Sequence, residues 1–333
     1  MYFCCHIGIL ISTPLSISKK QKMEKKHYNI IDFVRTILIT LVILIHIVNF
    51  GNLYPDTKEA ILSFLMPAFL LITGYLVNIN KPVKDFGLYL LRIFLPYAIM
   101  VTGYAILSLY LPVRDGISEF SIYTISRIIF ISAIGPYWFF HAMIVCGIIY
   151  YISFNVYRKL STIAHFSIFA FLLLLTAQYT PFLSIKSAVY YFIGAGIQLY
   201  FHDFSKIYKS SFWPVLPFLL IISNKEFRDW GALSVLIAVI CFISFTAKTS
   251  EYVKGKPLKI AEYIGRNTFP IYIFHPIFTM GAKYLLPIFS FDSTGLLHTA
   301  ITIILCIIGS LAIGNMMDCL HLSYLFGKKQ IMR

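Results

Sequence analysis

Four polar side chains share one face of the apolar segment 30–50. Arg35 and His46 are eleven residues apart, which is about three α-helical turns, so both point to the same side with a rise of about 16 Å between them. Asp32 lies three residues before Arg35, and Asn49 three after His46, so all four fall on one stripe. A histidine can accept a proton near neutral pH, and a guanidinium binds phosphate. The stripe therefore predicts one wall of a polar cavity.

A second polar stripe lies in the apolar segment 268–289. Its members are spaced by 4, 3 and 4 residues, which keeps them on one helical face, and they are Thr268, Tyr272, His275 and Thr279. Pro270 and Pro276 bracket its centre. A proline removes a backbone donor and frees a carbonyl, which neighbours, water or a ligand must then satisfy. This segment predicts a kinked second wall, although the sequence does not show that the two stripes face each other.

Each of these residues also has a purely structural interpretation. Arg35 lies close enough to one end of its segment to extend into the interface or to pair with Asp32. His46, Tyr272 and His275 could hydrogen-bond between helices. A charged side chain inside a bilayer nevertheless costs a few kcal/mol. The joint alignment of four polar residues therefore favours a functional cavity.

The elements that must position these residues are membrane-spanning helices. Apolar residues make up 59% of the 333 residues and charged residues only 13%, which excludes an ordinary soluble domain. A span needs roughly 20 apolar residues. The segment 211–223 is short and holds two prolines, so it could instead form a re-entrant hairpin with its neighbour. The sequence predicts an all-α, polytopic helix bundle of about ten spans, at 30–50, 59–78, 88–111, 137–154, 165–179, 185–201, 211–223, 231–246, 268–289 and 295–315.

The distribution of basic residues predicts the topology. Lysine and arginine accumulate in short cytoplasmic loops. Ten spans with the N-terminus inside place the basic clusters at 19–26, 248–266 and 328–333 on the cytoplasmic side, and so put both termini there. The net charge of +14 is thereby explained mainly as a topology signal, and it does not indicate a nucleic-acid partner.

The chain is expected to hold one domain. A cytoplasmic N-terminal segment at 1–27 precedes a membrane domain at 28–320, and a basic cytoplasmic tail follows at 321–333. The basic cluster follows the apolar stretch at the N-terminus, whereas a secretory signal has the opposite order, so we expect translation to start at Met23. Six scattered cysteines show no metal-binding or disulfide spacing, and no metal is predicted.

The first stripe resembles a known motif. Arg35 and His46, with ten residues between them, are similar to the first-helix motif of the membrane-bound acyltransferase 3 family, whose members acylate sugars and other hydroxyl acceptors. Further stretches resemble the family in the same order, although Thr73 stands where serine is usual. They are Met66-Pro67-Ala68-Phe69 through Gly74-Tyr75, Arg92 with Pro96, Tyr137-Trp138-Phe139-Phe140, and Asn267-Thr268-Phe269 through His275.

This resemblance implies transfer of an acyl group, usually acetyl from acetyl-CoA, to a hydroxyl of a cell-envelope saccharide in the bacterial inner membrane. His46 is the expected base, acting with Arg35, and Arg35 and Arg92 are expected to contact the donor phosphates. The donor is a substrate, so no permanently bound cofactor is expected. The sequence does not indicate the oligomeric state. The residues expected to support substrate binding are Trp138, Tyr272, His275 and Asn49.

Two other classes of protein remain open at this stage. A transporter or flippase of lipid-linked saccharides would also have many spans, intramembrane polar residues and helices broken by proline. Such proteins are often built from two related halves, and here the first five spans do not align with the last five. An assembly partner without chemistry would leave the charged stripe unexplained. Acetyl-CoA consumption separates the acyltransferase from both.

Overall fold

The computed structural model describes residues 14–110, 116–156 and 159–333, with side chains from residue 29 onward. The translation start predicted at Met23 lies outside the described side chains. The described part is helical and has no β-strand. Its α-helices are α1 (Pro14–His46), α2 (Val48–Leu53), α3 (Pro55–Leu76), α4 (Val83–Ser108), α5 (Ile122–Phe130), α6 (Trp138–Asn155), α7 (Thr162–Tyr179), α8 (Ile185–Tyr200), α9 (Val215–Ser223), α10 (Leu233–Tyr252), α11 (Lys256–Arg266), α12 (Thr268–Gly281) and α13 (Leu296–Cys319).

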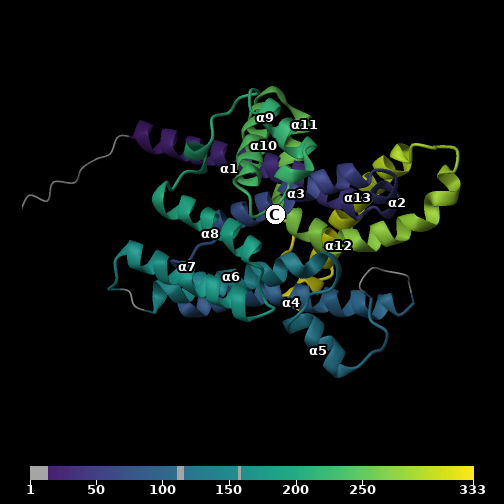
Figure 1. Ribbon diagram of the computed structural model, residues 1–333, viewed down its shortest axis with the longest axis horizontal. Coiled ribbons are helices and arrows are strands. Elements are labelled where there is room, and N and C mark those ends of the chain that lie inside the picture. The colour runs from purple at the N-terminus through teal and green to yellow at the C-terminus, as the bar shows by residue number, and fades with distance from the viewer. Residues whose placement is uncertain (1–13, 111–115, 157–158) are drawn as a thin grey trace, which may run out of the picture.

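Helices α9, α10 and α11 gather on one side of the bundle, and α4, α6 and α7 on the other (Figure 1). Between these groups, α1 packs against α3, α10, α11, α12 and α13. The helix that carries the first polar stripe is therefore surrounded by protein on several sides. This is the environment in which a bilayer-spanning helix can keep polar side chains.

Seven stretches of the described chain are long and apolar enough to cross a bilayer. They confirm a polytopic helical membrane protein, and they are Asn29–His46, Pro55–Leu76, Val83–Ser108, Gly135–Asn155, Thr162–Tyr179, Leu233–Tyr252 and Leu296–Cys319.

The other three predicted spans are shorter α-helices than the sequence suggested. Helix α8 has 16 residues and α9 has nine, and at 1.5 Å per residue α9 covers about half of a bilayer core. The segment 268–289 divides into α12 and the 3₁₀ helix Ala282–Phe289. Apolarity alone does not show where an α-helix ends, so the count of ten spans and the placement of both termini stay predictions.

Two glycines bring α3 and α8 into backbone contact. A Cβ atom at Gly74 would lie 2.2 Å from the carbonyl oxygen of Tyr191, and one at Gly194 would lie 2.0 Å from that of Leu71. Small residues allow such close crossings between membrane helices. Gly74 belongs to the Gly-aromatic pair noted in the sequence, and this contact gives the glycine a packing role.

We expect Gly194→Ala to destabilise the protein strongly. The added methyl group would meet backbone atoms of α3, which cannot rotate away, and overpacking of this kind costs about 1–3 kcal/mol or more. Thermal unfolding in detergent would measure the loss. Gly103→Ala is the matched control, because a Cβ there would meet nothing within 4 Å, and an equal effect of both variants would contradict the packing role.

Candidate active site

The two predicted polar stripes face each other. On α1, one terminal nitrogen of the Arg35 guanidinium donates a hydrogen bond to the hydroxyl of Thr268 on α12. At the C-terminal end of α1 and the middle of α12, the rings of His46 and His275 lie edge to face with centroids 5.2 Å apart. We call this interface between α1 and α12 the seam. Arg35 and Thr268 lie at one end of it, and His46 and His275 lie at the other.

Main-chain carbonyls fix the orientation of both imidazoles. The Nδ1 atom of His46 lies 2.7 Å from the carbonyl oxygen of Val42, and that of His275 lies 2.8 Å from the carbonyl oxygen of Tyr272. A carbonyl only accepts, so each Nδ1 carries the proton and each neutral ring keeps Nε2 as an acceptor. Pro276 has no N–H to donate to the Tyr272 carbonyl, and the His275 ring takes that place.

His275 is the more enclosed of the two histidines. Its side chain is fully buried, and its Nε2 atom has no hydrogen-bond partner among the described residues. His46 instead lines a cavity. The pair therefore consists of one ring that a substrate can reach and a second ring packed behind it.

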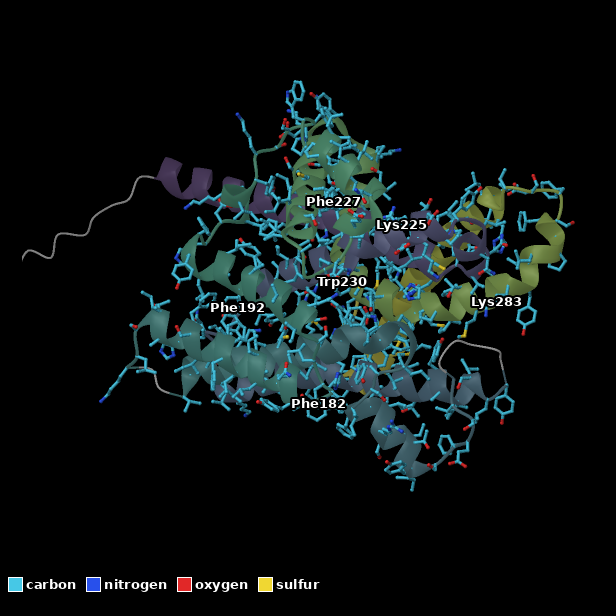
Figure 2. All side chains as sticks on the ribbon, in the orientation of Figure 1. Phe182, Phe192, Lys225, Phe227, Trp230 and Lys283 are labelled. Atoms are coloured by element: carbon cyan, nitrogen blue, oxygen red, sulfur yellow. The ribbon has the colours of Figure 1, made fainter. Side chains whose placement is uncertain are left out.

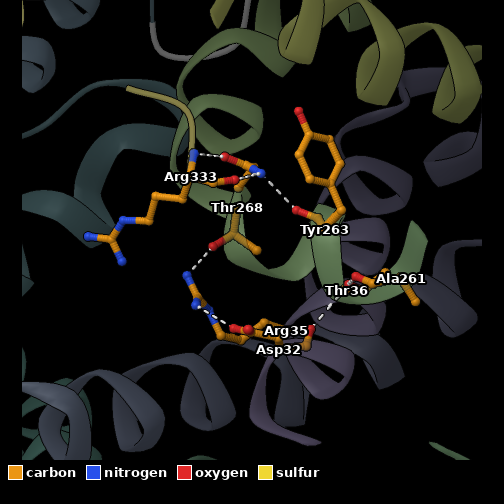
Figure 3. Close-up of polar contacts among 8 residues, drawn as sticks. Asp32, Arg35, Thr36, Ala261, Tyr263, Thr268 and Arg333 are labelled. Carbon is orange, nitrogen blue, oxygen red and sulfur yellow. Dashed lines mark hydrogen bonds and ion pairs between the residues drawn. The ribbon is translucent and has the colours of Figure 1, made fainter. Parts of the chain in front are cut away.

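Arg35 is held by contacts from two helices (Figure 3). Its guanidinium lies 3.2 Å from the carboxylate of Asp32, the local pair that the sequence allows. The neighbouring Thr36 donates to the carbonyl oxygen of Ala261 on α11. Helix α11 approaches so closely that a Cβ at Gly265 would lie 1.8 Å from the carbonyl oxygen of Asp32. Arg35 is therefore an ordered part of the seam, in addition to its local ion pair.

The residues at 327–333 cover the Arg35 end of the seam. The backbone N–H of Arg333 donates to the side-chain oxygen of Asn267 over 2.8 Å, and the Asn267 amide donates back to the Arg333 carbonyl oxygen over 3.1 Å. Asp318 accepts the N–H of Ile331 over 2.7 Å. The end of the described chain accordingly lies near the middle of the bundle (Figure 1).

Lys328 makes the packing of the 327–333 segment against the seam sensitive to pH. Burial, together with the charges of Arg333 and Arg92, lowers the pKa of Lys328 to about 7; its ammonium nitrogen lies 3.2 Å from the centre of the Phe269 ring. A lysine whose pKa is lower in the folded protein than in the unfolded chain destabilises the folded state increasingly as the pH falls below 10.5, the ordinary pKa of lysine. This destabilisation reaches its full size only below about pH 7, where Lys328 is protonated in the folded protein as well.

We therefore expect Lys328→Met to stabilise the protein below pH 7 and to have less effect at pH 9. Removing the titrating group removes the cost of charging it in a partly buried place. The difference in thermal midpoint between the variant and the wild type, followed from pH 6 to pH 9, measures this. A difference that does not change with pH would contradict it. Lys329→Met, next along the chain at a more exposed position, is the control.

A cavity of about 430 Å³ opens beside His46. Tyr272 and Trp138 also line it, and the indole rings of Trp138 and Trp230 lie 6.2 Å apart at an angle of 37°. Figure 2 labels Trp230 and Lys283, another lining residue. The cavity combines a proton acceptor with flat aromatic surfaces, which suits a small polar ligand.

Two tyrosine hydroxyls join α12 to the residues directly before Trp138. The hydroxyl of Tyr137 donates to the carbonyl oxygen of Ile273 over 3.1 Å, and the hydroxyl of Tyr272 donates to that of Pro136. These reciprocal bonds join α12 to the turn before α6, where Trp138 begins the helix. Tyr272 thus presents its ring to the cavity while its hydroxyl is engaged elsewhere.

Asn49 and Arg92 lie apart from the cavity lining. Helix α1 ends at His46 and Ile47 is extended, so the helical phase that placed Asn49 on the stripe is lost. The Asn49 amide lies close to Gly295 instead. Arg92 is exposed, and its Nε donates to the carbonyl oxygen of Gly327 over 2.9 Å. The structure brings His46, Trp138 and Tyr272 together in the cavity lining, with His275 packed against His46, and it places Arg35 beside Thr268 at the other end of the seam.

Sequence reasoning missed several lining residues. Trp230 lies between two helices, and its indole N–H donates to the carbonyl oxygen of Leu62 over 3.2 Å. Lys58 immediately precedes the apolar segment 59–78, where lysine is common for reasons of topology alone, and Lys283 lies inside the segment 268–289. No spacing rule connects these three positions, so only the fold could have assigned them to one cavity.

A second cavity of about 450 Å³ lies between α3, α6, α7 and α8. It is slightly larger than the cavity at His46, but it contains none of the predicted site residues. None of its described lining residues belongs to α1 or α12. The cavity at His46 is therefore the better candidate for the site of reaction.

Comparison with known proteins agrees with the sequence resemblance. The model of a protein family described as an acyltransferase domain matches residues 28–315. The match includes both polar stripes and every lining residue of the cavity at His46. No curated protein and no solved structure matches the chain.

Proposed function

The chain belongs to the acyltransferase 3 family and is a multi-pass membrane acyltransferase; on that premise we propose that it moves an acetyl group from acetyl-CoA to a hydroxyl of a cell-envelope saccharide in the bacterial inner membrane. The single observation that supports this proposal best is the placement of His46. Its Nδ1 is bonded to a main-chain carbonyl, and its ring lines the cavity. The remaining nitrogen is then available as a base.

The proposed reaction is a direct transfer. A saccharide hydroxyl donates its proton to Nε2 of His46, and the oxygen attacks the thioester carbonyl carbon. The carbon–sulfur bond breaks, and the imidazolium returns the proton to the CoA thiolate. The products are the acetyl ester and free CoA, and His46 is restored. His275, packed against His46, would act as a positioning residue.

Arg35 suits the donor end of this path. It lies about 16 Å along α1 from His46, by the rise of an α-helix, and near the predicted cytoplasmic side. A phosphate of CoA could bind the guanidinium while the pantetheine arm extends along the seam toward His46. Arg92 is proposed as an additional donor contact from its exposed position beside the 327–333 segment.

Labelled acetyl-CoA tests the proposal directly. Membranes that contain the wild-type protein should transfer the label to envelope saccharide, whereas membranes with His46→Ala at matched expression should not. His141→Ala is the control, because His141 bonds a carbonyl near α5 and lies outside the cavity lining. Absence of transfer by the wild type would contradict the proposal and would favour a transporter of lipid-linked saccharides.

A further inference from the structure

Residues 267–269, at the start of α12, each contact a different cationic residue. The contacts are the Asn267 amide with the backbone of Arg333, the Thr268 hydroxyl with the Arg35 guanidinium, and the Phe269 ring with the Lys328 ammonium. Figure 3 shows the Arg333 side chain on the same side of Thr268 as the Arg35 guanidinium, and the two charges are close enough to interact. The fold thus gathers cations from α1 and from the 327–333 segment at one end of the seam.

Arg92 on α4 adds a fourth cation. Its Nε donates to the carbonyl oxygen of Gly327 over 2.9 Å, directly before Lys328. Gly327 has a φ of +64°, and a Cβ there would lie 3.6 Å from Cγ of Arg92. Glycine adopts this backbone conformation at the lowest cost. The charges of Arg92 and Arg333 both act on the Lys328 ammonium, so these three side chains belong to one cluster.

The backbone of the 327–333 segment anchors it to the bundle. Asp318 on α13 accepts the N–H of Ile331 over 2.7 Å, and the Ile331 side chain is buried. The backbone of Arg333 is bonded in both directions to the side chain of Asn267. Because these bonds do not use the cationic side chains, those side chains can bind a ligand without releasing the segment.

The cations of this cluster outnumber the carboxylates beside them. Two carboxylates lie near: Asp32, which pairs with Arg35 over 3.2 Å, and Asp318, which accepts N–H groups of the segment. In the part of the chain that the structure describes, the other three cations have no carboxylate within ion-pair distance. They are Arg92, Lys328 and Arg333. The cluster therefore keeps a net positive charge, which favours an anionic ligand.

The position of the cluster favours a ligand that enters the bundle over a lipid headgroup. Arg35 lies on α1, which packs against α3, α10, α11, α12 and α13, and Lys328 is only partly exposed. The end of the described chain lies near the middle of the bundle (Figure 1). Basic segments that attract anionic lipids lie at the membrane surface instead. A soluble phosphate compound that reaches the seam is the better match.

CoA needs more positive charge than the two arginines already proposed as donor contacts supply. It bears a 3′-phosphate and a diphosphate, which together carry about three to four negative charges near pH 7. Arg35 and Arg92 provide two positive charges. Lys328 and Arg333 lie beside them and provide two more, and guanidinium and ammonium groups both form charge-assisted hydrogen bonds with phosphate.

We propose that the 327–333 segment completes the donor site, with Lys328 and Arg333 binding phosphate groups of CoA beside the two arginines. This inference rests on the proposed function, because it names further binding residues for the donor of that reaction. The two side chains hold the donor at the Arg35 end of the seam and take no part in proton transfer at His46.

Proton uptake on binding gives a test of Lys328 that does not depend on turnover. Burial and neighbouring charges lower the pKa of Lys328 to about 7, whereas a phosphate beside the ammonium would raise it. CoA phosphates are already ionised at pH 8, since their second pKa is about 6. Calorimetric titration with CoA at pH 8, in two buffers of different ionisation enthalpy, should therefore show uptake of about half a proton or more by the wild type.

Variants separate the charge of Lys328 from its titration. Lys328→Met should lose the proton uptake and bind CoA about tenfold more weakly, the size of effect that one charge-assisted contact gives. Lys328→Arg should keep most of the affinity but lose the uptake, because arginine does not titrate. Unfolding does not explain a weaker affinity of Lys328→Met, since this variant is expected to be at least as stable as the wild type.

Arg333→Met tests the second residue. It should also weaken CoA binding about tenfold, but it should retain proton uptake because Lys328 is still present. The backbone bonds between Arg333 and Asn267 do not require the guanidinium, so the segment should stay in place. Lys329→Met, at the exposed neighbouring position, is the matched control and should bind CoA as the wild type does. All titrations use the full chain in nanodiscs of phosphatidylcholine.

Four outcomes would overturn the inference. The first is equal CoA affinity of the wild type, Lys328→Met and Arg333→Met, and the second is undiminished proton uptake by Lys328→Met. The third is loss of the affinity difference between wild type and Lys328→Met when phosphatidylglycerol is added to the nanodiscs, which would assign the cluster to lipid headgroups. The fourth is absence of CoA binding by the wild type. Failure of the proposed function is distinct, because it appears as a wild type that binds CoA but transfers no acetyl group to saccharide.

Discussion

Replacing His46 with glutamine is expected to lower the kcat of acyl transfer by at least about a hundredfold, the usual contribution of a general base. Glutamine keeps much of the volume and can still hydrogen-bond near the Val42 carbonyl, which holds Nδ1 of the histidine over 2.7 Å. It cannot accept a proton. The KM for acetyl-CoA should change little, because the donor is proposed to bind at the other end of the seam.

Steady-state release of CoA thiol, measured on purified protein, separates these two constants. The thermal midpoint of the variant should lie close to that of the wild type, since His46 is only partly buried. A variant that retains kcat while raising KM would show that His46 binds substrate and does not act as the base. His275→Gln provides the comparison: it should also reduce kcat, but by less, because it acts through His46.

Helical periodicity was sufficient to find the residues of the seam and not sufficient to pair them. It placed Arg35 and His46 on one face, and Thr268 and His275 on another, and the structure joins them as Arg35 with Thr268 and His46 with His275. The pairing depends on how α1 and α12 cross. That crossing is determined by contacts with other helices, which one periodic pattern does not contain.

The places where the sequence interpretation failed have local causes. The stripe was extended to Asn49 on the assumption of an unbroken helix, but the backbone leaves the α conformation at Ile47. The span count of ten stays a prediction, because α9, within the segment 211–223 that could also form a re-entrant hairpin, has only nine residues. The sequence did not identify Trp230 as a cavity residue, because its position depends on packing between distant segments. Its indole N–H donates to the Leu62 carbonyl oxygen.

The sequence predicts only that the two prolines kink α12. In the structure, Pro276 also determines how the His275 ring is hydrogen-bonded. Pro270 falls in the first turn, where an N–H would have no helical partner in any case. Pro276 instead removes the donor that would reach the Tyr272 carbonyl, and the His275 ring replaces it over 2.8 Å. The residue that breaks the helix thereby fixes which nitrogen of His275 carries the proton.

Arg35→Met is expected to raise the KM for acetyl-CoA by about tenfold or more, because a guanidinium that binds phosphate makes charge-assisted bonds that methionine cannot replace. It should also destabilise the protein by about 3 kcal/mol, since Asp32 then loses its partner inside the bundle. Measured alone, this variant would not separate a role in binding from a role in folding.

The double variant Arg35→Met with Asp32→Asn separates them. Neutralising both partners removes the uncompensated charge, so much of the lost stability should return, whereas the KM for acetyl-CoA should remain high. Asp32→Asn alone should leave KM near that of the wild type, because the Arg35 guanidinium keeps its bond to Thr268 on α12. If the double variant recovered both stability and KM, Arg35 would be a structural residue of the seam, and the donor phosphates would have to bind elsewhere.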